Sequence, residues 1–158
     1  MAMADARFED GGESPLRLKA LDADDLNVIS TLVQDAVFPI TEMTWDRARR
    51  RFALLINRFR WEEGPRIGAH PPERVQALLV VEDVLSVASQ GIDRDESDTV
   101  LSLLALTWSA GEDGTGRITL MLAGDGAVAL DVECIDVTLR DVTRPYIAPS
   151  RQTPSHPE

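Results

Sequence analysis

Hydrophobic and charged residues alternate over residues 16–20, and this period of two predicts a strand with one buried face. Over residues 23–37 the apolar positions recur every three or four residues, which predicts an amphipathic helix. Asp22 supplies an N-cap oxygen three residues before Asp25, and Pro39 ends the helical pattern. The chain therefore begins with a strand and then a helix.

The period returns to two after this helix. Residues 40–45 and 52–61 flank a turn at residues 46–50, so we expect the two segments to pair as a hairpin. The second segment is apolar on both faces, with Phe52, Leu54 and Ile56 on one and Ala53 and Leu55 on the other. This pattern is typical of an interior strand that is covered on both sides, with the helix as one candidate cover.

The remaining chain reads as strands separated by loops rich in glycine, proline or aspartate. The expected strands span residues 75–81, 84–89, 99–108, 117–123 and 127–134, and the loops span 64–73, 91–98, 111–116 and 124–126. The alternation slips at Cys134–Ile135, which indicates a β-bulge there or a short C-terminal helix from Ile135. The parity of the preceding strand turns Cys134 inward, as an inert core thiol.

These elements predict an α+β fold that is predominantly antiparallel β, with seven or eight strands and one N-terminal amphipathic helix. A chain of 158 residues is most simply one domain, which we place at residues 15–143. Residues 1–14 are acidic and contain glycine, so we expect a flexible N-terminal segment. Residues 144–158 carry four prolines and are expected to form an irregular tail.

Charge and cysteine content narrow the classes of partner and compartment. The chain has 16 basic and 27 acidic residues, a net charge of −11, which disfavours nucleic acid without excluding it and disfavours anionic membranes. The single cysteine forms no internal disulfide, which fits a reducing compartment. We find neither a signal peptide nor an apolar stretch long enough to span a membrane, so we expect a cytoplasmic protein.

Known chemical motifs are weakly represented, so we expect no cofactor and no metal, and an enzyme is the less favoured class. The glycines of the 111–116 loop precede an alternating segment, so they fit a hairpin better than a phosphate loop. Asp93 and Asp95 begin a string that resembles a calcium loop, but the glycine and glutamate that such a loop requires are missing. His70 lies in the proline-rich loop and His156 near the end of the tail, so neither indicates a base held close to a nucleophile.

The most suggestive run extends from Arg47 to Trp61. Arginines cluster at the 46–50 turn, and arginine then alternates with aromatic residues at the end of the strand. An exposed arrangement of this kind stacks bases or binds an anion. The candidate binding residues are Arg58, Arg60, Trp61, Arg49 and Arg51. The alternative interpretation places the rings in the core and pairs the arginines with carboxylates.

Several strings resemble an uncharacterised proteobacterial family, the domain of unknown function number 2948. They are LKALDADDL at residues 18–26, RFAL at 51–54, NRFRW at 57–61, QGIDR at 90–94 and VECI at 132–135. The resemblance covers residues 16–142. It implies a small bacterial cytoplasmic protein, and it carries no activity, substrate or catalytic residue.

Our leading hypothesis is a non-enzymatic binding or assembly module that uses its sheet as the working surface. One helix covers only part of one sheet face, so a second sheet, the tails or another subunit must cover the rest. We therefore expect self-association, as a two-fold dimer. The alternatives are a nucleic-acid or anion binder that uses the arginine and aromatic run, and a metal-assisted enzyme that uses loop carboxylates such as Asp93 and Asp95.

Overall fold

The computed structural model describes residues 15–60, 73–93, 98–142 and 146–147. It contains one α-helix, α2 (Ala23–Leu32), and a short 3-10 helix, η2 (Ile40–Glu42). The strands are β1 (Arg17–Ala20), β2 (Val37–Pro39), β3 (Met43–Asp46), β4 (Arg51–Phe59), β5 (Glu73–Val81), β6 (Val84–Gln90), β7 (Val100–Ala110), β8 (Gly116–Leu122), β9 (Ala127–Val132), β10 (Val137–Asp141) and β11 (Tyr146–Ile147). The fold is thus mostly antiparallel sheet with one helix, as expected.

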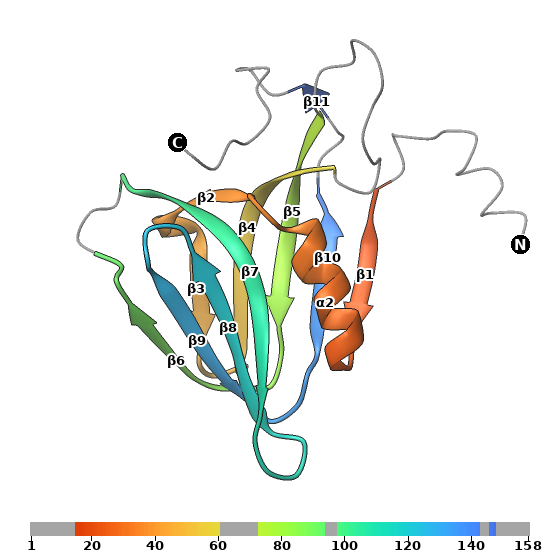
Figure 1. The fold of residues 1–158 in the computed structure, drawn as a ribbon, viewed down its shortest axis with the longest axis vertical. Helices are drawn as coiled ribbons and strands as arrows, with labels where there is room; N and C mark the ends of the chain where they lie inside the picture. Colours follow the sequence, from red (N-terminus) through yellow and green to blue (C-terminus); the bar gives the residue numbers. More distant parts are fainter. Residues whose placement is uncertain (1–14, 61–72, 94–97, 143–145, 148–158) are drawn as a thin grey trace, which may run out of the picture.

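The strands form one bent sheet in the order β1-β10-β5-β4-β2-β7-β8-β9-β6, with β3 beside β4 and β11 beside β5. Strand β2 joins its two halves, because Val37 pairs with Asn57 of β4 and with Ser102 of β7. We call β1, β10, β5 and β4 the β5 half, and β7, β8, β9 and β6 the β8 half. In Figure 1, β7, β8 and β9 lie in front of β4 and β5.

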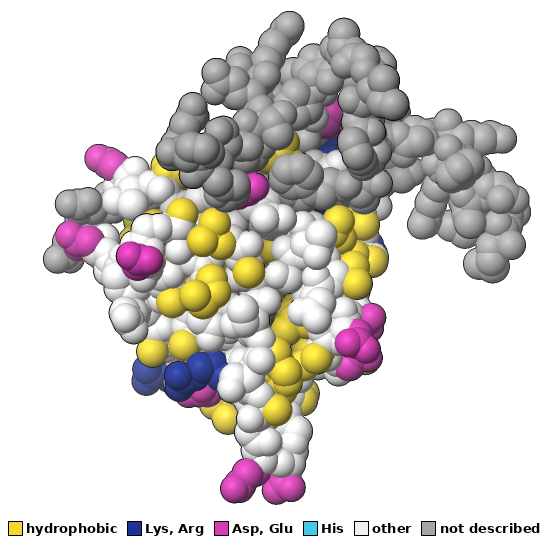
Figure 2. Space-filling view, in the orientation of Figure 1, with side chains coloured by type: hydrophobic (Ala, Val, Ile, Leu, Met, Phe, Trp, Pro, Cys, Tyr) yellow, Lys and Arg dark blue, Asp and Glu magenta, His cyan; other side chains and the backbone are white. Residues whose placement is uncertain are grey.

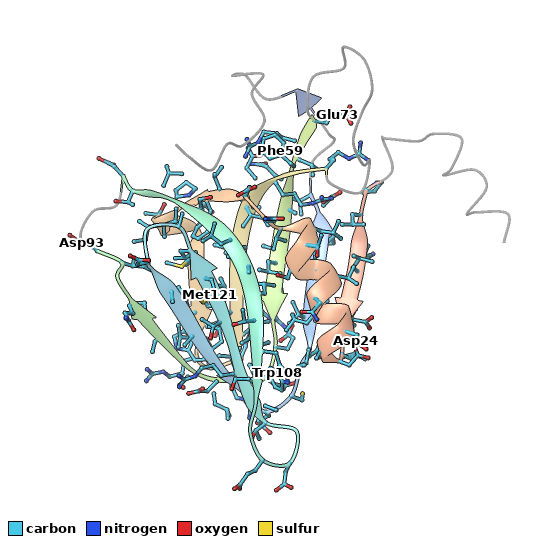
Figure 3. The ribbon with its side chains drawn as sticks, viewed as in Figure 1. Asp24, Phe59, Glu73, Asp93, Trp108 and Met121 are labelled. Atoms are coloured by element: carbon cyan, nitrogen blue, oxygen red, sulfur yellow. The ribbon has the colours of Figure 1, made fainter. Side chains whose placement is uncertain are left out.

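The core lies between the two halves and is built from their inward-facing residues (Figure 3). On β4, Phe52, Leu54 and Ile56 are almost fully buried, and on β8, Ile118 and Leu120 are buried to the same degree. Helix α2 packs against β1 and β7 and adds Leu26, Ile29 and Leu32 to the same core. The β8 half is therefore the main cover of the inner face of β4.

The opposite face of β4 differs from the expectation of a strand covered on both sides. Its outward residues, including Ala53 and Leu55, are half-buried, and among the described residues no further layer packs on them. The helix lies on β1 and β7 instead of on this face. Within the described ranges, the outer face of the β5 half is consequently left uncovered.

The N-cap is confirmed, since the backbone N–H of Asp25 donates to Asp22 Oδ1 at 2.8 Å. The predicted end of the helix at residue 37 was wrong: α2 ends at Leu32, and Asp35 takes a left-handed φ of 65°. The backbone N–H of Asp35 donates to the carbonyl of Leu103 at 2.8 Å, and Leu103 donates to the carbonyl of Ala36. Pairing with β7 therefore overrides the helical pattern and creates β2.

The two predicted hairpins are present as β3–β4 and β7–β8, although residues 40–42 of the first form η2 instead of strand, and the predicted loop 124–126 joins β8 to its partner β9. The count of seven or eight strands was too low, because ten described strands have three or more residues and β11 adds a two-residue one. The short strands β2 and β11 were missed, and β11 lies in the segment that we expected to be irregular. It pairs with the start of β5, where Tyr146 is opposite Arg74.

The slip in alternation near Cys134 has a different cause from the two that we considered. Strand β9 ends at Val132 and β10 begins at Val137, so the four residues between them form a connection outside the strands. Cys134 is exposed in this connection, and its assignment as a core thiol was wrong. The bulges or irregularities in pairing lie elsewhere, between Val84 and Ser86 and between Leu103 and Ala105. Among the described residues, no helix is long and apolar enough to cross a membrane.

Candidate functional site

Two arginines face each other on the outer surface of the β5 half. The β1–β10 register places Arg17 directly opposite Arg140, and Lys19 opposite Thr138. Because side chains alternate between the two faces of a strand, Arg17, Lys19 and Arg140 project from the face opposite the core. All three are exposed. Like charges at directly opposed positions of an antiparallel pair are destabilising, so this arrangement has no structural benefit of its own.

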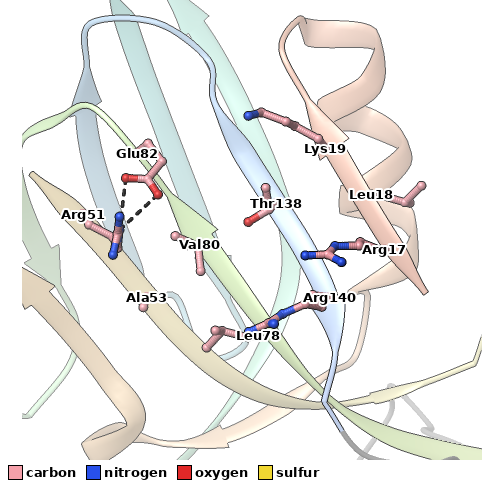
Figure 4. Close-up of a pocket in the computed structure, with 10 residues that line it drawn as sticks. All are labelled: Arg17, Leu18, Lys19, Arg51, Ala53, Leu78, Val80, Glu82, Thr138 and Arg140. Atoms are coloured by element: carbon pink, nitrogen blue, oxygen red, sulfur yellow. Dashed lines mark hydrogen bonds and ion pairs between the residues drawn. The ribbon is translucent and has the colours of Figure 1, made fainter. Parts of the chain in front are cut away.

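On β5, the next strand of the sheet, the positions opposite Arg140 and Thr138 are apolar. Arg140 is the register partner of Leu78, and Thr138 that of Val80. Val80 is in turn opposite Ala53 of β4. The result is a groove of about 750 Å³, which we call the outer groove, and Figure 4 shows its cationic and apolar sides. Four basic residues of the described part of this acidic chain line it: Arg17, Lys19, Arg51 and Arg140.

Ion pairs compensate the charge of some basic side chains of the outer groove and not of others. Arg51 Nε donates to both carboxylate oxygens of Glu82, at 3.1 and 3.0 Å. Lys19 Nζ lies 3.6 Å from Asp136 Oδ1. In the described part of the chain, neither Arg17 nor Arg140 forms an ion pair with a carboxylate. The uncompensated positive charge therefore lies on the β1 and β10 side of the groove.

Arg58, which we singled out from the sequence, lies in the interior with a side-chain exposure of 0%. It continues the inward-facing positions of β4 that begin with Phe52. Its Nε donates to Asp141 Oδ1 at 3.1 Å, and its Nη2 donates to Asp141 Oδ2 at 3.0 Å. The pairing with a carboxylate agrees with the alternative interpretation of the arginine and aromatic run. That interpretation placed only the rings in the core, whereas the structure buries Arg58 as well.

Arg60 is also buried, and its Nη1 donates to Glu73 Oε1 at 2.7 Å. Phe59 is 3% exposed and carries the guanidinium of Arg74 over its ring, 4.1 Å from the centroid. Trp61 falls outside the described residues. Arg58 and Arg60 thus do not combine into an exposed stacking surface.

The arginines of the 46–50 turn are directed to separate partners. Arg49 is largely exposed and lies 3.8 Å from Asp46. Arg50 forms ion pairs with Glu133 and with Asp83, the latter at 3.8 Å. The other candidate from this run, Arg51, lies in the outer groove. The structure therefore brings one of the five sequence candidates into a site with other basic residues.

The remaining chemical candidates do not converge. Asp93 is exposed after β6, and Asp95, His70 and His156 lie outside the described residues. Within the ranges that the structure describes, no three histidine, cysteine or acidic side chains form a group suited to a metal ion. Desolvation raises the pKa of the Cys134 thiol, and its hydrogen bond to Asp83 raises it further. Such a thiol is a weaker nucleophile at neutral pH.

Sequence reasoning missed Arg17, Lys19 and Arg140 as site residues. The alternation over residues 16–20 places Arg17 and Lys19 on one face, which was a usable signal. The position of Arg140 opposite Arg17 depends on a pairing between strands at the two ends of the domain. No local pattern encodes that register.

Comparison with known proteins identifies a family and nothing closer. The family model described as "Protein of unknown function (DUF2948)" matches residues 16–156. No curated protein matches the chain, and no solved structure matches it. The chain therefore belongs to the family of the domain of unknown function number 2948.

Proposed function

We propose that this protein is a non-enzymatic binding module and that the outer groove binds an anionic ligand with an apolar part. The observation that carries the proposal is the direct opposition of Arg17 and Arg140 on the exposed side of the groove. An anion between the two guanidinium groups removes their mutual repulsion and accepts charge-assisted hydrogen bonds from both. Arginine is suited to this task because its planar donors match carboxylate and phosphate groups.

Protection of a sheet edge is a second reason for charge on β1, because charged side chains discourage edge-to-edge pairing. It accounts for Arg17 and Lys19, which lie on the edge strand. It does not account for Arg140 on the second strand or Arg51 on the fourth. A shared ligand explains Arg140, which lies directly opposite Arg17, whereas Arg51 is held by Glu82.

The floor of the groove favours an amphiphilic ligand over a purely ionic one. Leu78, Val80 and Ala53 are half-buried and lie beside the basic side chains (Figure 4). A ligand that covers them removes apolar surface from water, at about 25 cal/mol per Å². The volume of the groove falls in the range typical of small-molecule sites.

The residues of the groove favour a binding site over a catalytic site. They also favour a small anion over a nucleic acid as the ligand. Glu82 is the one carboxylate among the lining residues that the structure describes, and it accepts two hydrogen bonds from Arg51. None of the described residues that line the groove is aromatic, whereas base stacking on aromatic rings is a main source of affinity for single strands. The net charge of −11 also opposes a long phosphate backbone.

Calorimetric titration with octyl phosphate, below its micelle concentration, tests the proposal. We expect binding that weakens with salt, since the cationic side chains are exposed. Inorganic phosphate and octanol each carry half of the recognised chemistry and are expected to bind at least tenfold more weakly. The double variant Arg17→Gln, Arg140→Gln should lose binding of octyl phosphate by at least tenfold.

Arg117→Gln is the matched control, because Arg117 is an exposed arginine on the β8 half and pairs with Asp131. Its affinity for octyl phosphate should equal that of the wild type. Equal loss in the control and the double variant would show non-specific attraction and overturn the proposal. Absence of binding by the wild-type protein at millimolar octyl phosphate would overturn it as well.

A further inference from the structure

The two ends of the sheet are built differently. Strand β1, at one end, has two basic residues among its four, and α2 packs against it. Strand β6, at the other end, has the sequence VLSVASQ, without a charged residue or a proline. Natural sheets protect their edges with charge, proline or a cover, because an unprotected edge presents backbone donors and acceptors to other strands. By this criterion β1 is protected and β6 is not.

Strand β6 is also accessible. Its register partners all lie on β9, and the described strand order ends with β6. Leu85 is 51% exposed, and every residue from Ser86 to Gln90 is exposed or half-buried. Val84 at the start of the strand donates its backbone N–H to the carbonyl of Arg50. Beyond Val84, the uncharged strand therefore presents both its backbone edge and apolar side chains to the surroundings.

Charge is arranged around β6 in a way that selects a second copy of this chain. Arg47 lines a cleft of about 460 Å³ with Leu85, Ser86 and Val87, near the start of the strand. Asp93 follows the end of the strand (Figure 3). In an antiparallel pair the start of each β6 lies beside the end of the other. Two-fold pairing thus brings Arg47 of each copy toward Asp93 of the other, while the uncharged strands meet between them.

The net charge limits where two copies of this chain can meet. With a net charge of −11, two copies repel one another at long range, so the contact requires a region of low or complementary charge. Figure 2 shows the face that includes the β8 half, where most acidic side chains lie toward the margins. The β6 edge combines low charge on the strand with opposite charges at its two ends.

We infer that β6 is the interface of a two-fold homodimer, in which the β6 strands of two copies pair antiparallel and join their β8 halves into one continuous sheet. Such an interface is isologous, because each copy contributes the same strand. Backbone hydrogen bonds supply the affinity, as in other strand-addition complexes. The inference is independent of the ligand proposed for the outer groove, which lies on the β5 half.

Sedimentation velocity from 1 to 100 µM tests the interface with the variant Ala88→Lys. Ala88 is an exposed residue of β6, and its register partner on β9 is Ala129. We expect the wild type to be dimeric at 100 µM and Ala88→Lys to raise the dissociation constant at least tenfold. Ala129→Lys introduces the same charge one strand further in, and we expect it to remain dimeric.

Three results would overturn the inference. The first is a wild type that is monomeric at 100 µM, and the second is an Ala88→Lys variant that remains dimeric. The third is an equal loss of dimer in both variants, which would indicate that the copies pack through the face of the sheet. Circular dichroism checks that the variants are folded. If Ala88→Lys does not fold, hydrogen exchange of the wild-type protein at two concentrations tests the interface instead. Dilution to 1 µM should accelerate exchange of the β6 amides, and exchange independent of concentration contradicts the interface.

Discussion

Arg58 of β4 and Asp141 of β10 form a doubly hydrogen-bonded ion pair inside the sheet, on either side of β5. Asp141 Oδ2 also accepts from the backbone N–H of Leu16 at 2.8 Å, and Arg58 Nη1 donates to the carbonyl of Phe59 at 3.1 Å. The pair therefore links β4 to β10 across β5 and, through Leu16, to the residue that precedes the edge strand β1. Its position is structural, because both side chains are almost fully excluded from solvent.

Removal of one member of this pair should be strongly destabilising. Asp141→Ala removes the carboxylate that accepts two hydrogen bonds from the buried Arg58 guanidinium, and we expect the free energy of unfolding to fall by about 3–5 kcal/mol. Urea denaturation followed by circular dichroism measures this loss. Glu82→Ala removes the partner of the half-exposed Arg51 and should cost no more than about 1 kcal/mol.

Replacement of both members separates charge burial from packing. Arg58→Met combined with Asp141→Leu removes both charges and fills the space with apolar atoms, so it should recover most of the stability lost in Asp141→Ala. A double variant as unstable as the single variant would show that the hydrogen bonds to Leu16 and Phe59 dominate.

Gly116 at the start of β8 should not tolerate a side chain. A Cβ there would lie 2.4 Å from Cη2 of Trp108 and 2.5 Å from the carbonyl oxygen of Ser109. The backbone cannot recede, because Gly116 pairs with Ala110 on one side and with Val132 on the other. We expect Gly116→Ala to cost about 1–3 kcal/mol and to shift the indole N–H resonance of Trp108.

Gly114 provides the control for that substitution. It has a positive φ of 84° and nothing within 4 Å of its Cβ position. Gly114→Ala therefore strains the backbone without a steric clash, so it should destabilise without displacing the indole resonance. An unchanged Trp108 resonance in Gly116→Ala would contradict the steric argument.

The sequence pattern predicts the helix and most strands, but it does not predict which distant strands pair with one another. The alternation that buries Phe52 continues through the strand to Arg58, so the pattern itself turns this arginine inward. Its charge favoured a surface position only because its counter-ion, Asp141, is distant in the sequence. Because Arg17 and Arg140 are also distant in the sequence, their direct opposition was not predicted. Cys134 was misplaced for another reason, since the parity of β9 was extended beyond its end at Val132.

Asp83 should slow the reactions of Cys134. The thiol lies 3.4 Å from Asp83 Oδ2, and this contact adds to desolvation in raising the pKa of Cys134. Because the thiolate is the reactive species, a raised pKa lowers its fraction at pH 8. Asp83→Asn removes the negative charge, so it should lower the pKa and speed alkylation by iodoacetamide. The rate should still trail that of an unstructured cysteine peptide, since the desolvation remains.

The control for this reaction is Asp125→Asn, at the β8–β9 turn. Asp83 and Asp125 both have positive φ, 56° and 68°, a region that asparagine tolerates as well as aspartate. Equal alkylation rates for the wild type and Asp83→Asn would show that Asp83 does not affect the thiol. A faster rate in Asp125→Asn would point to a general loosening of the fold.

Arg117 and Asp131 should give the β8 half a stability that disappears in acid. Arg117 Nε donates to Asp131 Oδ1 at 2.8 Å, and this hydrogen bond holds the pKa of Asp131 below its ordinary value. A carboxyl whose pKa is depressed by folding stabilises the protein above its unfolded pKa, about 3.9, and loses that contribution as the pH falls through the folded value. Carbon-detected NMR titration should show Arg117→Gln raising the pKa of Asp131. The difference in unfolding free energy between the two proteins should be small at pH 7, because the pair is exposed, and should shrink below pH 4. A difference that grows on acidification would mean that Arg117 stabilises the sheet through contacts other than this carboxylate.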